Sequence, residues 1–514
     1  MTVCLLASSL YITAFADESN ESVIRVSGLK RGGNNELETI GSFSSFKDGW
    51  NEAVKTAEDS DKMNEGNYER IVVDLLADWT ATDGKLGSGD GFSSGAIEFP
   101  GNAPLTLNLN GHKINRKLDE WKWNGEVIYI GTKADAIINN GTITGGWSGG
   151  GAGGIHIDDK ARVVLNDVHI VGNIADDDDG GGIAVYDGAV LVMNRGSIKY
   201  NCVRADTDYV GVDYLGFAVN GLGGAIYVED SEIMLNEVDI ISNQTRSEHH
   251  LGAAIYARYS KVTLDSCRIE ENGISGDEKD TSDDENVFLD EEEVILDEDS
   301  DPPYKEERLT GDANKIYTAY SVLSGYKADF IIKNTTFSKN GAYLEKEQKI
   351  GERKKVYSTL IYMDQSKLVL EGGKFENNAS AYLIELLDSS INATGTHFIN
   401  NDSDMMHGKV ESDSFFKNCK FNNNIGIYSA WDGIPTFGTL SNKVNFYDCD
   451  MGNSTYADKS VINIVDDGTG SLLGQGNISM ILSLFSFFIA CAAMGVVITR
   501  KQKKQEALNP IIKE

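Results

Sequence analysis

A short step ending in asparagine recurs along most of this chain, with a phenylalanine or an isoleucine three residues before the asparagine. The shortest spacing between copies, from Phe375 to Phe398, is 23 residues. Repeats of this length predict a solenoid, because each unit must stack on its neighbours to bury its apolar side. The copies are Ile170–Asn173, Ile198–Asn201, Ile240–Asn243, Ile269–Asn272, Phe337–Asn340, Phe375–Asn378, Phe398–Asn401 and Phe421–Asn424.

Within one repeat the apolar residues alternate with polar ones, which is typical of strands with one buried face. Three such strands separated by corners predict one turn of a parallel β-helix, and no sustained 3.6-residue period favours helical repeats. In the copy from 254 to 272 the alternating pairs are Ile255 and Ala257, Val262 and Leu264, and Cys267 and Ile269.

Glycine and asparagine are expected at the corners for structural reasons. A Gly-Gly step precedes several copies, and glycine accepts positive φ and allows one backbone to approach the next. We expect the repeated asparagine to adopt the left-handed conformation and to hydrogen-bond, amide to amide, with its copies in neighbouring coils. The repeated Phe and Asn residues are therefore interpreted as core and ladder.

The step Gly223-Gly224-Ala225-Ile226, followed by the F-x-x-N steps, resembles the repeats of polymorphic membrane proteins within the wider pectin-lyase-like superfamily. The resemblance covers roughly Glu126 to Thr455. It implies a right-handed parallel β-helix, and it implies surface display and a role in adhesion. The fold expected is thus all-β: a right-handed β-helix solenoid with an N-terminal helical cap and a C-terminal transmembrane helix.

The N-terminal cap is predicted from an amphipathic stretch, 46–57, with Phe46, Trp50, Ala53, Val54 and Ala57 on one side. Such a helix would cover the open end of the solenoid core. We assign 17–125 to this cap and the first coils and 126–465 to the repeats. An acidic stretch, 274–315, reads as a disordered insertion between coils.

Both ends of the chain carry apolar segments. Residues 1–16 close in Ala14-Phe15-Ala16 and predict a signal peptide; the alternative is a buried first strand. After a spacer, 466–477, the uncharged stretch 478–499 would span ~33 Å as a helix, enough to cross a bilayer. The basic run that follows it predicts a cytoplasmic tail, 500–514, and an external solenoid. We expect a single-pass protein at the cell surface.

The net charge and the positions of the cysteines limit which binding partners and bonds are expected. The net charge is −33, which disfavours nucleic acid because phosphates demand a basic face. The sequence contains no C-x-x-C pair, so it gives no indication of a zinc site. Cys419 and Cys449 each precede the Phe/Met position by two residues and should stack on adjacent coils, as a disulfide or as two buried thiols. We expect no obligate oligomer.

Two clusters are candidate sites. Asp176, Asp177, Asp178 and Asp179 could hold calcium through oxygen ligands, although four acids on a loop are more often a solvated turn. Trp121, Trp123 and Trp147 lie beside loops and could stack on sugar rings, or pack those loops against the solenoid. No catalytic constellation is found; the histidines on predicted strands, His156 and His169, lack a Ser or Cys partner.

Three functions therefore compete. A surface module binding glycans or surface proteins is favoured by the predicted anchor and by the unreactive repeats. A polysaccharide lyase or hydrolase would need converging acids or bases, for which only Asp176–Asp179 qualify, with calcium as the one conceivable cofactor. A passive surface spacer is the third.

Overall fold

The fold is described from a computed structural model, and its description covers part of the chain. The predicted signal peptide, Asp177, the acidic insertion, the spacer, the predicted transmembrane segment and the tail lie outside the described residues. The described residues are 22–32, 36–81, 97–101, 103–176, 178–204, 221–246, 251–273, 321–341, 359–424, 437–440, 442, 444–450 and 462–465.

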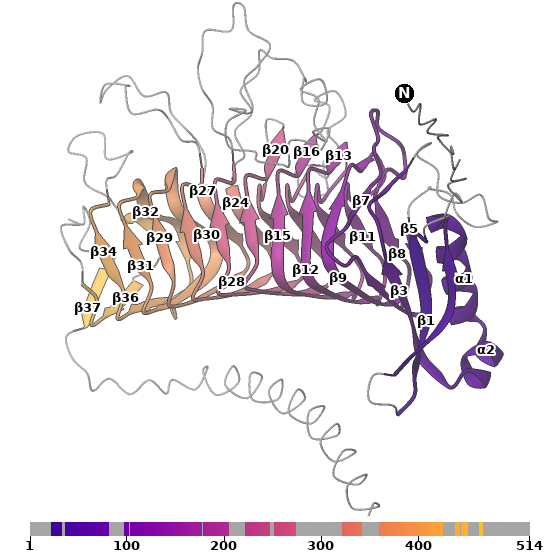
Figure 1. The fold of residues 1–514 in the computed structure, drawn as a ribbon. Coiled ribbons are helices and arrows are strands. Elements are labelled where there is room, and N and C mark those ends of the chain that lie inside the picture. The colour runs from indigo at the N-terminus through magenta and orange to yellow at the C-terminus, as the bar shows by residue number, and fades with distance from the viewer. Residues whose placement is uncertain are drawn as a thin grey trace, which may run out of the picture. The chain divides into compact units, whose positions relative to one another are not determined.

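The described residues are mostly β, with 58% in strands and 6% in helices. Nearly all strands belong to one 33-stranded sheet, and most pair in parallel with an equivalent strand one repeat later. Figure 1 shows these strands following one another in chain order along the stack, from the indigo end to the yellow end. The prediction of an all-β, solenoid-like fold is confirmed at this level.

The strands form three columns, named here in chain order within a repeat. The first column contains β5 (Ile97–Phe99), β8 (Ile128–Ile130), β11 (Ile155–Ile157), β14 (Ile183–Val185), β17 (Ile226–Glu229), β21 (Ile255–Arg258), β24 (Ser321–Tyr326), β27 (Thr359–Asp364), the start of β30 (Ala379–Thr394), β32 (Asp402–Val410) and β35 (Phe437–Leu440).

The second column leads directly into the third, and in some repeats one long strand serves both. The second contains β3 (Tyr68–Leu75), β6 (Pro104–Asn108), the starts of β9 (Asp135–Thr144), β12 (Arg162–Val171) and β15 (Val190–Lys199), then β18 (Glu232–Asn236), β22 (Lys261–Asp265), β25 (Asp329–Lys333), β28 (Lys367–Glu371), the end of β30, β33 (Phe415–Lys417) and β36 (Val444–Tyr447). The third contains β4 (Trp79–Thr80), β7 (Lys113–Asn115), the ends of β9, β12 and β15, then β19 (Asp239–Ile241), β23 (Arg268–Glu270), β26 (Thr336–Ser338), β29 (Lys374–Glu376), β31 (His397–Ile399) and β34 (Lys420–Asn422). A last short strand is β37 (Ile462–Val465).

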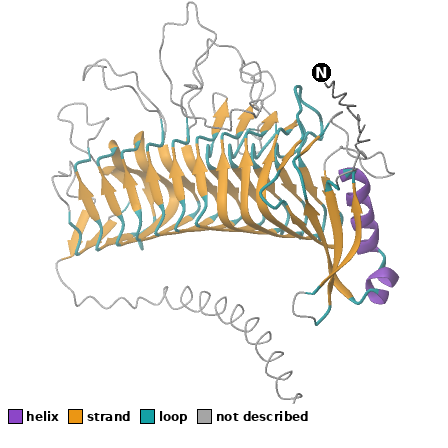
Figure 2. Cartoon of the chain, in the orientation of Figure 1, coloured by secondary structure: helices purple, strands orange, loops and turns teal. Residues whose placement is uncertain are grey.

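The N-terminal end contains the predicted helix and two strands that the repeat pattern did not predict. Helix α1 (Phe46–Glu58) buries Phe46 and Trp50, and the Trp50 ring meets Phe99 of β5 edge-on at 5.0 Å. A second helix, α2 (Ser60–Glu65), follows it. Strand β1 (Ile24–Lys30) pairs antiparallel with β3, and β2 (Leu37–Phe43) pairs antiparallel with β1. Figure 2 shows both helices beside these first strands.

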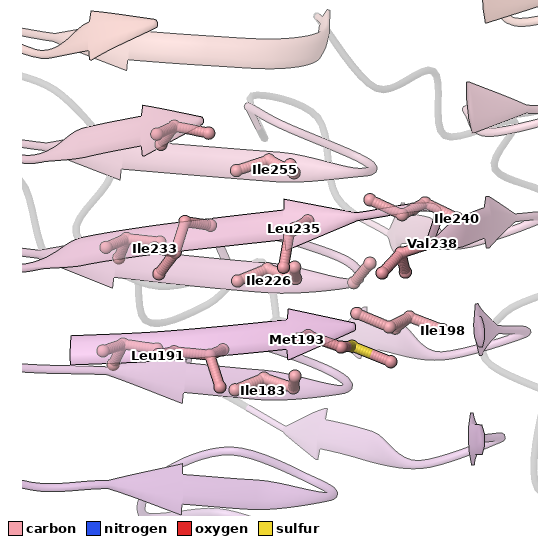
Figure 3. Packing of buried hydrophobic residues seen from close by; sticks show 14 of the residues in the cluster. Ile183, Leu191, Met193, Ile198, Ile226, Ile233, Leu235, Val238, Ile240 and Ile255 are labelled. Carbon is pink, nitrogen blue, oxygen red and sulfur yellow. The ribbon is translucent and has the colours of Figure 1, made fainter. Parts of the chain in front are cut away.

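Buried apolar side chains from the three columns stack in rows from coil to coil. Ile183, Ile226 and Ile255 occupy one such row in the first column, and each is fully buried. Figure 3 shows them packed against second-column residues such as Leu191 and Ile233. Because each row repeats one side-chain shape at the strand spacing, neighbouring coils bury one another's apolar surface.

The repeated phenylalanines form one of these rows, as predicted. Phe337, Phe375, Phe398 and Phe421 are buried, and successive rings are stacked with centroids 4.4, 5.0 and 5.0 Å apart. Offset stacking of this kind adds to the stabilisation that burial provides.

The repeated asparagines form the predicted amide ladder, but their backbone conformation was predicted wrongly. Each is buried, and from Asn201 onward its side-chain oxygen accepts hydrogen bonds from the backbone N–H and the side-chain amide of the previous copy, as Asn201 does from Asn173 at 2.9 and 3.0 Å. The left-handed residue is the one before the asparagine, as at Tyr200 (φ 56) and Lys339 (φ 53). That residue turns the chain, and the asparagine side chain points inward to satisfy the backbone groups that the turn exposes.

A separate four-stranded parallel sheet extends from the early coils. It contains β10 (Trp147–Ser148), β13 (Ile174–Asp176), β16 (Cys202–Arg204) and β20 (Gln244–Arg246), and β13, β16 and β20 are seen at the upper side of the stack in Figure 1. Strands β13, β16 and β20 each directly follow an asparagine of the ladder, which fixes where they begin, whereas β10 follows Gly146, whose backbone N–H donates to the Asn173 side chain at 3.1 Å. The sheet contains Trp147 of the predicted ligand site and Asp176 of the predicted calcium site.

The chain divides into two compact units, 1–464 and 465–514, and of the second only Val465 is described. Among the described residues no helix is long and apolar enough to cross a membrane; the stretch predicted to do so, 478–499, lies outside them.

Candidate functional site

The tryptophans predicted to bind ligand lie at the edge of the small sheet. Lys122 forms a parallel bridge with Ser148: its N–H donates to the Trp147 carbonyl at 3.0 Å, and its own carbonyl accepts from Gly149 at 2.8 Å. The flanking indoles, Trp121 and Trp123, are 55% and 70% exposed, the two most exposed large apolar side chains among the described residues. We call Trp121, Trp123 and Trp147 the tryptophan platform.

Glycines beneath the platform allow the indoles to lie close to the backbone. A Cβ added at Gly149 would stand 2.9 Å from the Trp121 ring, and one at Gly150 would stand 2.4 Å from the Trp123 carbonyl and 3.2 Å from its indole nitrogen. Any larger residue would displace the indoles. The exposed rings are therefore supported from below by this turn.

The third tryptophan is held by polar partners. The Trp147 indole N–H donates to the Asp176 carboxylate at 2.9 Å, and the Arg204 guanidinium lies 4.9 Å from the ring centroid. A cation over an indole face is attracted by the ring quadrupole. Trp147 is only half-exposed, so it supports the platform more than it offers a free face.

A buried polar network anchors the platform to the solenoid. The Ser148 hydroxyl, fully buried, accepts from the backbone N–H groups of Gly125 and Gly150 at 3.2 and 3.4 Å, and it donates to the Glu126 carboxylate at 3.4 Å. Arg116 in turn donates to the Glu126 carbonyl. Burial raises the pKa of Glu126 to about 7 and lowers that of Arg116 to about 10.

The aspartates predicted to bind calcium have other partners in this structure. Asp176 accepts from Trp147, and Asp178 accepts from the backbone N–H of Asp179 at 2.7 Å. The Asp179 carboxyl is buried and accepts from the backbone N–H of Leu222 at 2.8 Å, so it caps the corner of the next coil. Burial, with the nearby Asp178 charge, raises its pKa.

Asp177 lies outside the described residues, and within the described part of the chain no group of three or more His, Cys, Asp or Glu side chains could hold a metal ion. The calcium site stays a prediction.

Sequence reasoning missed an aromatic ladder on the outer face of the first column. Rings of Tyr129, His156, Tyr186, Tyr227 and Tyr256 follow one another with centroids 5.2, 5.0, 5.5 and 5.7 Å apart. The signal was present: an aromatic residue or histidine directly follows the first isoleucine of the strand in several repeats. Burial lowers the pKa of His156 to about 4, so it stays neutral in the folded protein at physiological pH.

The prediction that His169 lacks a serine partner is wrong. Its Nδ1 lies 2.9 Å from the Ser197 hydroxyl of the next coil. Burial, with the nearby Lys199, lowers the pKa of His169. Ser197 is only 3% exposed, so its hydroxyl is out of reach of a large substrate, and we assign the pair a structural role.

Cys419 and Cys449 lie on adjacent coils, as predicted, and are free thiols in this structure. Lys420 bridges to Asp450, and the Asp450 N–H donates to the Cys419 carbonyl at 2.9 Å, which places the two cysteines in register. Their thiols interact; the pKa of Cys449 is lowered by a hydrogen bond with Cys419.

Comparison with known proteins found no family model that matches the chain, and no curated protein or solved structure matched it.

Proposed function

We propose that this protein is a membrane-anchored surface protein whose parallel solenoid presents the tryptophan platform to glycans. The supporting observation is the exposure of Trp121 and Trp123 on a rigid base. Exposing two indoles to water is unfavourable because it leaves apolar surface unburied. The glycine turn at 149–150 nevertheless holds both rings at the surface. Flat aromatic faces beside polar groups such as Asp176 and Arg204 suit pyranose rings, which offer an apolar face and a rim of hydroxyls.

The wider architecture in this proposal rests on the sequence. The right-handed, closed β-helix follows from the resemblance to pectin-lyase-like and polymorphic membrane proteins, and adhesion is what that resemblance implies. The signal peptide at 1–16, the span at 478–499 and the cytoplasmic tail at 500–514 follow from hydropathy and charge. A solenoid outside the membrane would display the platform, together with further copies on neighbouring molecules, for multivalent contact.

The binding test compares variants of the full chain on a glycan array. Trp123→Ala and Trp121→Ala should each weaken binding about five- to thirtyfold, since losing one stacked aromatic removes about 1–2 kcal/mol. Tyr259→Ala is the matched control, because Tyr259 is also exposed, at 36%, but lies on the later turn after β21. Equal binding by all variants would remove the platform from the proposal.

The same preparation separates binding from catalysis and from passive spacing. Incubation with polysaccharides and calcium should yield no new reducing ends and no unsaturated products. Products that disappear in Asp178→Asn would replace adhesion with an enzyme. Absence of both binding and turnover would favour the spacer.

Topology is tested on intact cells. Added protease should release the solenoid and leave the stretch from Ile478 onward protected. Release of the whole chain by high salt alone would refute the anchor, because salt weakens electrostatic attachment and leaves an apolar span in place.

A further inference from the structure

The outer face of the second column carries a row of side chains that are apolar in every coil but one, where the residue is Thr263, and the row ends at polar residues in register, Thr106 before it and Asn392 after it. At the central outward position of each strand, successive coils place residues in register, and all but the last are half-buried rather than buried. The row is Ile137, Val164, Val192, Met234, Thr263, Ile331 and Val369. Val190, 36% exposed, lies beside it at the strand start. We call this set the outer row.

The third column shows that a solvent-facing row in this solenoid need not be apolar. At the outward position directly before the buried Ile or Phe, successive coils carry only polar or charged residues, and all except the buried Ser197 are half-exposed or exposed: Thr142, His169, Ser197, Asp239, Arg268, Thr336, Lys374, His397 and Lys420. The outward position directly after the buried residue is mixed and includes Val171, Ile241 and Ile399. Strands with one solvated face normally alternate in this way. The outer row departs from that pattern across consecutive coils, which is expected of a face that packs against something.

Charges beside the outer row fit a second copy of the same face. The strand-start positions in the same coils are Asp135, Arg162, Val190, Glu232, Lys261, Asp329 and Lys367. If two copies meet face to face about a two-fold axis through Met234, the order of coils is reversed. Arg162 then lies opposite Asp329 of the other copy, and Asp135, which is already paired with Arg70 of its own chain at 2.7 Å, lies opposite Lys367. The two glutamates at the axis are each neutralised by Lys261, 2.7 Å away in the same chain.

Arg162 and Asp329 provide the sharpest part of this complementarity. Both are exposed, and neither forms an ion pair within the part of the chain that the structure describes. Several other charged side chains on these coils are paired between neighbouring coils, as Arg195 is with Asp167 at 2.7 Å. A two-fold contact would supply the missing partner twice, once on each side of the axis.

The area of the face sets the strength of the contact. From Ile137 to Val369 the row spans six coil steps, about 29 Å at ~4.8 Å each, and a five-residue strand is about 16 Å long. Each copy thus offers roughly 460 Å², and two copies bury roughly 900 Å², which is at the weak end of specific interfaces. We infer that the outer face of the second column is a reversible homodimer interface with its axis at Met234.

The test is sedimentation equilibrium of the full chain in mild detergent over a range of concentrations. We expect a monomer–dimer equilibrium. Arg162→Asp and Asp329→Arg should each raise the dissociation constant about tenfold, because each places like charges opposite one another twice. The double variant, Arg162→Asp with Asp329→Arg, restores opposite charges and should return to the wild-type value. Both positions are exposed, so the fold is not at risk.

Two further variants separate the interface from other causes. Met234→Lys should abolish the dimer, whereas Thr142→Lys, at the equivalent outward position of the third column, should leave it unchanged. A monomer at all concentrations would overturn the inference. So would a dimer that the charge variants leave unchanged, since that dimer would be held elsewhere, for example through 478–499. A double variant no better than either single variant would refute the two-fold geometry.

Discussion

Truncation of Asn201 to alanine is expected to cost several kcal/mol, because its side chain serves backbone and side-chain groups of three coils. Its Oδ1 accepts from the backbone N–H and the Nδ2 of Asn173, at 2.9 and 3.0 Å. Its Nδ2 donates to the carbonyls of Ile170 and Lys199 and to the Oδ1 of Asn243, each at 3.0 Å. The residue is fully buried, so no water can replace these bonds.

The expected loss of stability follows from the hydrogen-bonding groups that Asn201→Ala would leave without a partner. The buried backbone N–H of Asn173 loses its acceptor, at about 1–3 kcal/mol, and the Asn173 amide keeps only its longer bonds to the carbonyls of Val171 and Ile143, at 3.3 and 3.4 Å, so the expected loss is about 3 kcal/mol. A second, separate row of asparagine amides, on the outer face of the second column, provides the control. Asn166 donates to Asn139 at 2.8 Å and accepts from Asn194 at 2.9 Å, but these residues are half-exposed. Water can replace its bonds, and Asn166→Ala should cost less than about 1 kcal/mol.

The assay is hydrogen exchange of the native full chain, supported by urea unfolding, because a long repeat array need not unfold in a single step. Asn201→Ala should speed exchange most in β12, β15, β16 and β18, the strands on either side of the residue. Equal costs for Asn201→Ala and Asn166→Ala, within about 1 kcal/mol, would refute the assignment of the ladder as a stabilising element.

Four smaller predictions follow from other buried groups. Phe398→Ala should destabilise the solenoid by about 3–5 kcal/mol, measured by urea unfolding, because it empties the middle of a stacked row. Cys449, which is partly exposed, should react with an alkylating reagent before the buried Cys419, and both should be labelled after unfolding, as read by mass spectrometry of the two peptides that contain them; if neither peptide is labelled without reductant, the pair forms a disulfide. The pKa of Glu126 is raised in the folded state, so its contribution to stability should fall as pH rises from about 4.5 to about 7, and Glu126→Gln should flatten that slope in thermal unfolding. The pKa of His156 is lowered, so stability should be lost as pH falls from 6.5 towards about 4, by about 3 kcal/mol in total; His156→Phe should remove this loss while keeping the stacked ring.

The sequence was sufficient to predict structural features that recur in every repeat, and it was insufficient to predict those that occur once. The alternation of apolar and polar residues predicted the strands, and the spacing of Phe and Asn predicted the buried phenylalanine row and the asparagine ladder, because every copy repeats the same pattern. The amphipathic pattern predicted α1 with Trp50 inward. Strands β1 and β2 were missed, since they pair antiparallel at one end and belong to no repeat. The corner was misplaced by one residue, because asparagine suits both a left-handed turn and a buried amide ladder, and only the packing decides.

For the candidate sites, sequence reasoning located the residues but could not decide what each contacts. Tryptophans beside a loop can either pack inward or face solvent; in the structure Trp147 is half-exposed with its indole N–H on Asp176, whereas Trp123 faces solvent. A run of aspartates looked like one cluster, yet Asp176 and Asp179 point to different partners, an indole and a backbone amide. Such differences depend on the partner strand, which lies a whole coil away in sequence.

The outer faces of the solenoid differ from one another far more than its inner rows do. Inside, each coil must match the previous one, so Ile follows Ile and Phe follows Phe. Outside, stacking imposes only the strand spacing, yet the first column carries an aromatic ladder, the second an apolar row and the third polar residues. Stability could be achieved with any of these surfaces, because the core rows and the asparagine ladder already hold the coils together. The choice of a different surface for each face is therefore best explained by what each face contacts, and substitutions there should change binding or association before they change folding.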